Sequence, residues 1–129
     1  MSKVLHRILY IEDEADIQAI AKIALEAVGG FSVEVCSSGE EALRCGPASP
    51  PDLILLDVMM PGMDGPSTLL RLREFPVLAT TPVIFMTAKV QPAEIAYFRS
   101  LGALDVIAKP FDPMNLPRQV SEIWGRVHG

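Results

Sequence analysis

The stretch Leu53–Gly62, with the sequence LILLDVMMPG, carries the strongest structural signal in this chain. Its four consecutive apolar residues predict a β-strand buried on both faces, as in a parallel sheet. The apolar run ends abruptly at the carboxylate of Asp57, and a Pro-Gly turn follows. Open α/β sheets bind ligands at the carboxyl ends of their strands, so this acid marks a candidate site. Three other strand-like runs also end in polar residues, which are Glu12-Asp13, Thr87 and Lys109.

Length and composition predict one domain with a substantial core. The chain has 129 residues, of which 50% are apolar. A net charge of −5 without a basic stripe argues against a nucleic-acid-binding surface. No apolar run reaches the length of a membrane span, and the N-terminal run is too short for a signal peptide. Cys36 and Cys45 lack metal-ligand spacing, and we expect them to be reduced, partly buried thiols in a cytoplasmic protein.

Strand-like and helix-like patterns alternate along the chain. This alternation predicts an α/β fold in which helices cover both faces of a parallel sheet. The expected strands are residues 8–11, 32–36, 52–56, 82–87 and 105–108. The common order for five strands in doubly wound, flavodoxin-like sheets is 2-1-3-4-5, and we expect that order here.

Five helices are expected between and after these strands. The first places Ile17, Ile20, Ala21, Ala24 and Val28 on one apolar face and stops at Gly29-Gly30. The second is short and ends before the loop at 46–51, and the third opens at Gly65-Pro66. The fourth spans 92–101, and the last is capped at Asp112-Pro113, with Pro117 as a potential kink.

In this strand order the first and third strands are neighbours at the topological switch point. Their carboxyl ends bring Glu12, Asp13 and Asp57 into one crevice. Three carboxylates at such short range repel one another unless a cation joins them. An all-oxygen ligand set without His or Cys favours Mg²⁺, with Mn²⁺ as the alternative.

Each of these residues also has an ordinary structural explanation. The four acids of this region, Glu12, Asp13, Glu14 and Asp16, would complement the positive end of the following helix, and Asp57 would act as a turn or cap residue. Thr87 would be a strand-end hydroxyl, and Lys109 a solvated lysine. These explanations must all hold independently, whereas a single site accounts for every position.

The residue types together suggest phosphoryl chemistry. A carboxylate such as Asp57 can attack a phosphoryl group and form a mixed anhydride. Phosphoryl transfer mainly requires charge neutralisation and positioning. Lys109 would hold a phosphoryl oxygen as a point charge, and the Thr87 hydroxyl would donate to another.

The chain resembles the response-regulator receiver domain of two-component signalling, in a chemotaxis-regulator-like form. The resemblance covers about residues 7–126 and rests on four motifs: ILYIEDE at 8–14, DVMMPGMDG at 57–65, MTA at 86–88 and KPF at 109–111. It implies that residues 1–129 form a single receiver domain with no output domain. It also implies a signalling module rather than an enzyme.

The resemblance further implies a role for each site residue. Asp57 would be the phosphoacceptor, Thr87 the switch hydroxyl and Lys109 the phosphate-binding lysine. Asp13, Asp57 and the backbone carbonyl of Met59 would ligate Mg²⁺, and Glu12 would act through bound water. The Lys109-Pro110 peptide bond is expected to be cis.

The chain shows three departures from the family pattern, the third of which involves a pair of residues. Glu12 replaces the more frequent aspartate, and Val106 stands where many members carry a switch Tyr or Phe, so output coupling must differ in detail. Met59 and Lys89 flank the approach of water to the phosphoryl group. Because apolar Met59 cannot orient a hydrolytic water, we expect a comparatively long-lived phosphorylated form.

The implied phosphodonor is a sensor histidine kinase or a phosphotransfer protein. The implied output face combines the helix at 92–101, the strand at 105–108 and the last helix; it would bind a downstream protein or support a phosphorylation-dependent homodimer. Alternatives are a phosphorelay intermediate, a receiver fragment of a hybrid kinase and a degenerate receiver used as a scaffold. An aspartate-nucleophile phosphatase is more remote, because Met59 stands where its second acid would be. A flavin module is disfavoured, since no phosphate loop follows the first strand.

Overall fold

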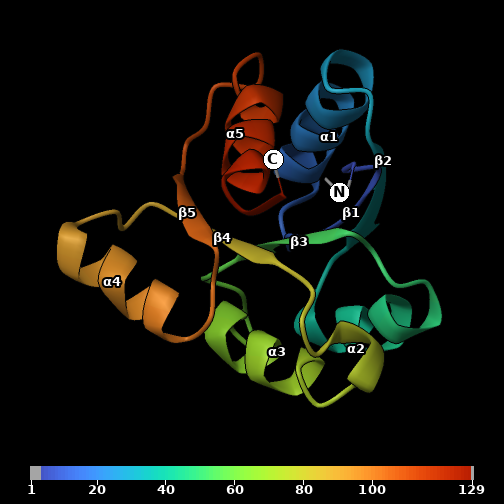
Figure 1. Ribbon diagram of the computed structural model, residues 1–129, viewed down its shortest axis with the longest axis vertical. Coiled ribbons are helices and arrows are strands. Elements are labelled where there is room, and N and C mark those ends of the chain that lie inside the picture. Colours follow the sequence, from blue (N-terminus) through green and yellow to red (C-terminus); the bar gives the residue numbers. More distant parts are fainter. Residues whose placement is uncertain (1–3, 129) are drawn as a thin grey trace.

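The computed structural model describes residues 4–128, and its centre is a sheet of five parallel strands (Figure 1). The strands follow the order β2-β1-β3-β4-β5, which confirms the predicted flavodoxin-like topology. The strand bounds are β1 (Arg7–Ile11), β2 (Ser32–Cys36), β3 (Leu53–Asp57), β4 (Val83–Thr87) and β5 (Asp105–Ala108).

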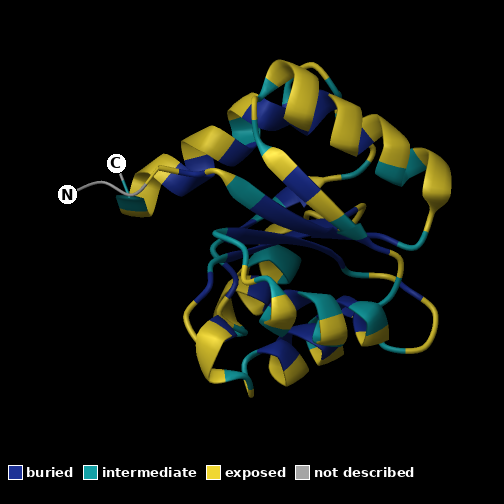
Figure 2. Ribbon diagram, turned by 90° about the vertical axis from the view of Figure 1, so that its right-hand side faces the viewer, coloured by how far each residue is buried: buried dark blue, intermediate teal, exposed yellow. Residues whose placement is uncertain are grey.

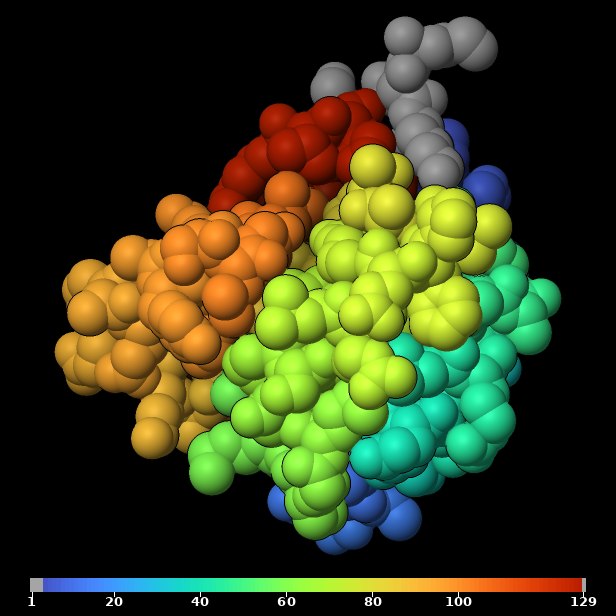
Figure 3. Space-filling model, turned by 90° about the horizontal axis from the view of Figure 1, so that it is seen from below, coloured from blue at the N-terminus to red at the C-terminus, as the bar shows by residue number. Residues whose placement is uncertain are grey.

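Helices cover both faces of this sheet. Helices α1 (Ala15–Ile23) and α5 (Leu116–His128) lie on one face, and α1 continues as a π-helical turn, η1 (Ala24–Val28). The other face carries α2 (Gly39–Ala48), α3 (Gly65–Leu72) and α4 (Pro92–Ser100), which Figure 3 shows from outside. A 3₁₀ turn, η2 (Pro76–Leu78), follows α3. No helix within residues 4–128 combines the length and apolar character needed to cross a membrane.

The sheet separates two apolar cores because strand side chains alternate between its faces. Ile8 and Tyr10 of β1 belong to the core under α1 and α5, whereas Leu9 and Ile11 belong to the core under α2, α3 and α4. All five residues of β3 and of β4 are buried, as expected for central parallel strands (Figure 2). This burial fixes the register that positions the strand ends.

The buried face of α1 is narrower than the sequence pattern predicts. Ala21, Ala24 and Leu25 are buried, but Ile20 is 47% exposed and Val28 is 51% exposed. The prediction assumed one regular helix of 3.6 residues per turn through position 28. The wider turn of η1 takes Val28 out of the apolar stripe, whereas Ala21 and Leu25 belong to the core under α1 and α5.

Several element boundaries also differ from the prediction, and each strand end that differs does so by a single residue. Helix α2 continues through Gly46 and Pro47 because buried Gly46 packs under Leu72 and Leu78, and this packing outweighs local propensity. Helix α5 begins at Leu116, since Asp112 instead caps a separate turn by accepting from the Met114 amide at 3.0 Å. Pro117 is the second residue of α5, where no intrahelical amide bond is lost, so no kink follows. Asp57 is itself the last residue of β3.

Candidate functional site

Three strand ends bring Glu12, Asp57 and Lys109 together. The register pairs Ile11 of β1 with Leu56 of β3, so the next residues, Glu12 and Asp57, lie side by side. The residue two positions before each of the three belongs to the core under α1 and α5. Alternation along the strands therefore turns all three side chains to that side of the sheet.

Lys109 forms the centre of this group. Its Nζ donates to Glu12 Oε1 at 2.8 Å and to Asp57 Oδ1 at 3.1 Å. The Lys109 side chain is 16% exposed, the Asp57 side chain is 5% exposed and the Glu12 side chain is fully buried. A partly buried cation that bridges two buried carboxylates neutralises part of the charge that burial would otherwise penalise.

The surroundings of Asp57 favour its protonated form. Burial and the nearby Glu12 carboxylate raise the pKa of Asp57 from 3.8 to about 6, although Lys109 opposes this change. Burial works against the charge of Lys109, but hydrogen bonds and charge from the two acids raise its pKa above the ordinary value. Added positive charge beside Asp57 would therefore favour its ionised form.

The acids also form a cluster that fits a hard cation. Ligand oxygens of Glu12, Asp13 and Asp57 all lie within 4.8 Å of one another. Asp13 is the most exposed of the three, so the cluster opens to solvent on its side. Carboxylate oxygens without nitrogen or sulfur donors suit Mg²⁺. The predicted acidic residues are therefore brought together in a form that fits the expected ion.

Thr87 lies across a small cavity from the acids. Asp57, Thr87, Lys109, Glu14 and Met59 all contribute to the lining of this cavity, whose volume is about 140 Å³. The Thr87 hydroxyl is buried and accepts from the Lys89 amide at 3.1 Å. A water molecule occupies about 30 Å³ of liquid, so the space admits a group of several heavy atoms between Asp57 and the Thr87 hydroxyl.

The loop after β3 holds Asp57 in place through a close backbone contact. The Gly65 amide donates to the Val58 carbonyl at 2.8 Å. A Cβ at position 65 would lie 2.6 Å from the Asp57 carbonyl oxygen, so only glycine fits without movement. At the neighbouring strand end, the Lys109-Pro110 peptide bond is cis, as expected.

Two residues that were not predicted as part of the site also contribute to it. The buried Tyr10 hydroxyl donates to Glu12 Oε1 at 3.2 Å, and burial together with Glu12 raises the pKa of this phenol. Tyr10 precedes Glu12 by two residues on one strand, a spacing that could have identified it. Glu14, expected only as a helix-terminal acid, lines the cavity with Asp57.

These contacts also bear on the expected role of Glu12. Its Oε1 accepts from both Tyr10 and Lys109, and its Oε2 accepts from the Glu14 amide at 3.3 Å. The side chain is thus held by protein donors and anchors the lysine.

Known proteins share both the sequence and the fold. The family model for the response regulator receiver domain matches residues 8–121. The alkaline phosphatase synthesis transcriptional regulatory protein PhoP of Bacillus subtilis is 36% identical over 120 residues, covering 93% of this chain and 49% of that protein. The chain spans about half the length of the curated relatives it matches.

Two solved structures are similar over nearly their whole length. The chemotaxis protein CheY4 of Vibrio cholerae superposes with a TM-score of 0.85 at 26% identity, covering 93% of this chain and 99% of that one. The signal receiver domain of a signal transduction histidine kinase from Syntrophus aciditrophicus has a TM-score of 0.79 at 34% identity, covering 95% and 92%. With the family match over most of its length, this chain belongs to the response regulator receiver domain family.

Proposed function

We propose that this receiver domain accepts a phosphoryl group on Asp57 from a sensor histidine kinase or a phosphotransfer protein. The observation that carries the proposal is the convergence of Asp57, Lys109 and Thr87 on one cavity of about 140 Å³ beside the acidic cluster. An ionised Asp57 Oδ would attack the phosphorus atom while the bond from phosphorus to the donor nitrogen breaks. Lys109 would then exchange its contact with Asp57 for one with a phosphoryl oxygen, and Thr87 would donate to another.

Asp13, Asp57 and the Met59 carbonyl are the proposed ligands of Mg²⁺, with Glu12 acting through water. The ion supplies charge neutralisation at the phosphoryl group when bound. The raised pKa of Asp57 supports this part of the proposal, because added positive charge would favour the ionised nucleophile. The domain itself is proposed to work as a cytoplasmic signalling module and not as an enzyme that turns over a substrate.

The proposed output face consists of α4, β5 and α5. Asp105 of β5 is buried and binds Arg99 of α4 at 3.0 Å and Arg126 of α5, so one acid ties the three elements together. Burial alone would raise the pKa of Asp105, but hydrogen bonds from the Val106 amide and from both guanidinium groups hold this pKa below its usual value. A coordinated change of these three elements is therefore a physically reasonable response to a shift at Thr87.

A second cavity provides room for such a shift. It has a volume of about 620 Å³, and Thr87 and Lys89 line it together with Tyr97 and Phe98 of α4. Tyr97 is 53% exposed, whereas Phe98 is buried against Phe85. Movement of the Thr87 hydroxyl toward a phosphoryl group would draw the loop at 88–91 away from this space, and α4 begins directly after that loop. We propose that this movement alters binding of a downstream protein or of a second receiver.

A relay role is the second candidate. The Syntrophus aciditrophicus neighbour is the receiver domain of a histidine kinase, which supports a phosphorelay intermediate or a hybrid-kinase receiver as an alternative context. The phosphatase alternative has less support, because the exposed Met59 side chain at the rim of the cavity offers no proton-transfer group. The prediction that residues 1–129 act as a single domain without an output domain stays a prediction.

Intact-protein mass spectrometry with acetyl phosphate tests the proposed chemistry. Wild-type protein should gain a Mg²⁺-dependent phosphoryl adduct, and Asp57→Asn should abolish it. Asp16→Asn is the matched control, since Asp16 is an exposed acid in the first turn of α1. An adduct that persists in Asp57→Asn, or that forms equally without Mg²⁺, would contradict the assignment. Incubating the phosphorylated protein with a phosphotransfer domain then tests the relay, because a relay intermediate passes the adduct onward.

Hydrogen exchange tests the proposed output face. Phosphorylation should change amide protection in α4, β5 and α5 more than in α2, which serves as the internal reference. Thr87→Ala should still form the adduct but lose most of this difference, because the hydroxyl that couples the phosphoryl group to the loop is gone. Identical protection in both states of the wild type would argue against a switch at this face.

A further inference from the structure

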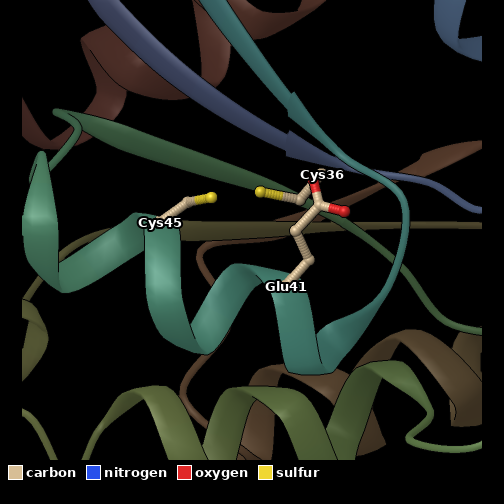
Figure 4. Close-up of side chains that lie close together, drawn as sticks. All are labelled: Cys36, Glu41 and Cys45. Atoms are coloured by element: carbon tan, nitrogen blue, oxygen red, sulfur yellow. The ribbon is translucent and has the colours of Figure 1, made fainter.

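A second group of potential metal ligands lies away from the phosphorylation site, between β2 and α2. It consists of Cys36, the last residue of β2, and of Glu41 and Cys45 in α2. Ligand atoms of the three side chains all lie within 4.8 Å of one another. Figure 4 shows the two sulfur atoms pointing toward each other, with the Glu41 carboxylate beside Cys36.

The spacing of these residues suits a metal better than the linear sequence suggests. Glu41 and Cys45 are separated by four positions on α2, so both side chains lie on one helical face. Cys36 faces them from the sheet, and its nine-residue separation from Cys45 matches no linear metal motif. Two ligands from one turn of helix and a third from a neighbouring element form a typical three-ligand arrangement.

The distances require only a small contraction around an ion. Zinc–sulfur bonds of about 2.3 Å in a tetrahedral site separate two sulfur atoms by about 3.8 Å. The two sulfur atoms lie within 4.8 Å of each other, so they would need to approach by about 1 Å or less. A disulfide would require the same sulfur atoms to approach to about 2.05 Å, which demands a larger movement of α2 toward β2.

We propose that Cys36, Glu41 and Cys45 form a second metal site, which binds Zn²⁺ or a similar thiophilic divalent cation with one position left open. The donor set of two sulfurs and one carboxylate oxygen distinguishes this site from the all-oxygen cluster of Glu12, Asp13 and Asp57. On binding, both thiols lose their protons, so two protons are released for each ion.

Burial and charge around Cys36 are consistent with a cation partner. Cys36 is fully buried, and burial together with Cys45 and the acids Glu41 and Glu34 raises the pKa of its thiol. Without a cation, this environment favours the protonated thiol. A bound divalent ion reverses this preference, because it is the largest local charge and deprotonates a coordinating thiol outright.

The bound ion would fasten α2 to the end of β2, close to the phosphorylation site. The Cys36 carbonyl accepts from the Glu12 amide at 3.0 Å, so the thiol site and the acidic cluster share a strand end. Gln18 also links this region, since its Nε2 donates to the Ser37 hydroxyl and to the Glu12 carbonyl. Metal binding should thus stabilise the fold while leaving the oxygen ligands for Mg²⁺ available.

Metal titration of the reduced protein in excess Mg²⁺ tests the site. Wild type should bind one Zn²⁺ in a manner that protects both thiols from alkylation, and Co²⁺ should give a thiolate-to-metal charge-transfer absorption. Mutation of a residue that only hydrogen-bonds to a metal ligand typically costs about 10–100-fold in metal affinity. Cys45→Ala removes a ligand itself, so it should weaken Zn²⁺ binding by about 100-fold or more. Glu41→Gln should weaken it measurably, and Glu40→Gln is the matched control because Glu40 is the adjacent exposed acid.

The variants are chosen so that the fold survives. Cys45 is only partly buried. Glu41→Gln retains the backbone amide that donates to the Ser38 hydroxyl, the N-cap of α2, at 3.1 Å. Equal Zn²⁺ affinity in wild type, Cys45→Ala and Glu41→Gln would overturn the proposal. So would Co²⁺ spectra without sulfur ligation, or a Cys36–Cys45 disulfide found in place of metal binding. Weaker thiol-dependent binding in both variants, with Glu40→Gln unchanged, would establish the site.

Discussion

The raised pKa of Asp57 predicts that this carboxyl lowers the stability of the metal-free protein as the pH rises. Its pKa is about 6 in the folded chain against an ordinary value of 3.8. Between these two values the folded chain holds a proton that the unfolded chain has released. The stabilising contribution is therefore complete below the unfolded pKa and is lost as the pH rises through the folded pKa.

The size of this loss follows from the same two pKa values. Each pKa difference of one corresponds to 1.36 kcal/mol, so the loss amounts to about 3 kcal/mol. Asp57→Asn has no proton to release and should lack this contribution. The free energy of unfolding of wild type relative to Asp57→Asn should accordingly fall by about 2 kcal/mol of this total between about pH 4 and pH 7.

Urea denaturation in metal-free buffer at several pH values measures this difference. Trp124 is the single tryptophan and is buried in the core under α1 and α5, so its fluorescence reports unfolding. Contributions from acids that both proteins share, such as Asp105, cancel in the comparison. A relative stability that stays level or increases over this range would refute the reasoning. Excess Mg²⁺ should reduce the loss, because an ion that binds the ionised site stabilises the folded chain.

Three further changes give measurable outcomes. Lys109→Met removes a charged hydrogen bond worth about 1.5–3 kcal/mol, so the pKa of Asp57 should rise by about 1–2, as measured by a carboxyl-carbon NMR titration. Lys89→Met is the exposed control, and a lower pKa of Asp57 in Lys109→Met would contradict the proposed contacts of the site. Gly65→Ala places a Cβ 2.6 Å from the Asp57 carbonyl oxygen, and a loss of about 1–3 kcal/mol in urea unfolding is expected, whereas an unchanged stability would show that the loop yields freely. Met59→Asn should shorten the life of the phosphorylated form after donor removal, as followed by mass spectrometry; an equal or longer life would count against the role of the apolar side chain.

The pattern of apolar residues was sufficient to predict the fold. Alternating strand and helix periods predicted five parallel strands, because burial on two faces gives central strands continuous apolar runs. Their order followed the common doubly wound arrangement, and the structure confirms it. Helix details were less predictable. The π-helical turn at 24–28 and the packing of Gly46 depend on contacts with other elements, which local propensity does not contain.

The location of the candidate site was likewise readable from the chain. Asp57, Thr87 and Lys109 each follow an apolar run, and the carboxyl ends of parallel strands meet at one edge. The hydrogen-bond partners were not readable. Tyr10 and Lys109 share one oxygen of Glu12, and Lys109 lies 97 residues away from that acid.

The sequence by itself thus determined the α/β class and the polar strand ends, because local periodicity decides these properties; the strand order came from the precedent of doubly wound sheets, and with it the edge at which the acids gather. Only the tertiary structure decided which groups touch. It showed that Glu12 anchors Lys109, that Val28 leaves the core, and that Cys36 meets Glu41 and Cys45. Such contacts depend on strand register and helix packing to within about an ångström, and a pattern of residue types in one dimension does not specify distances at that scale.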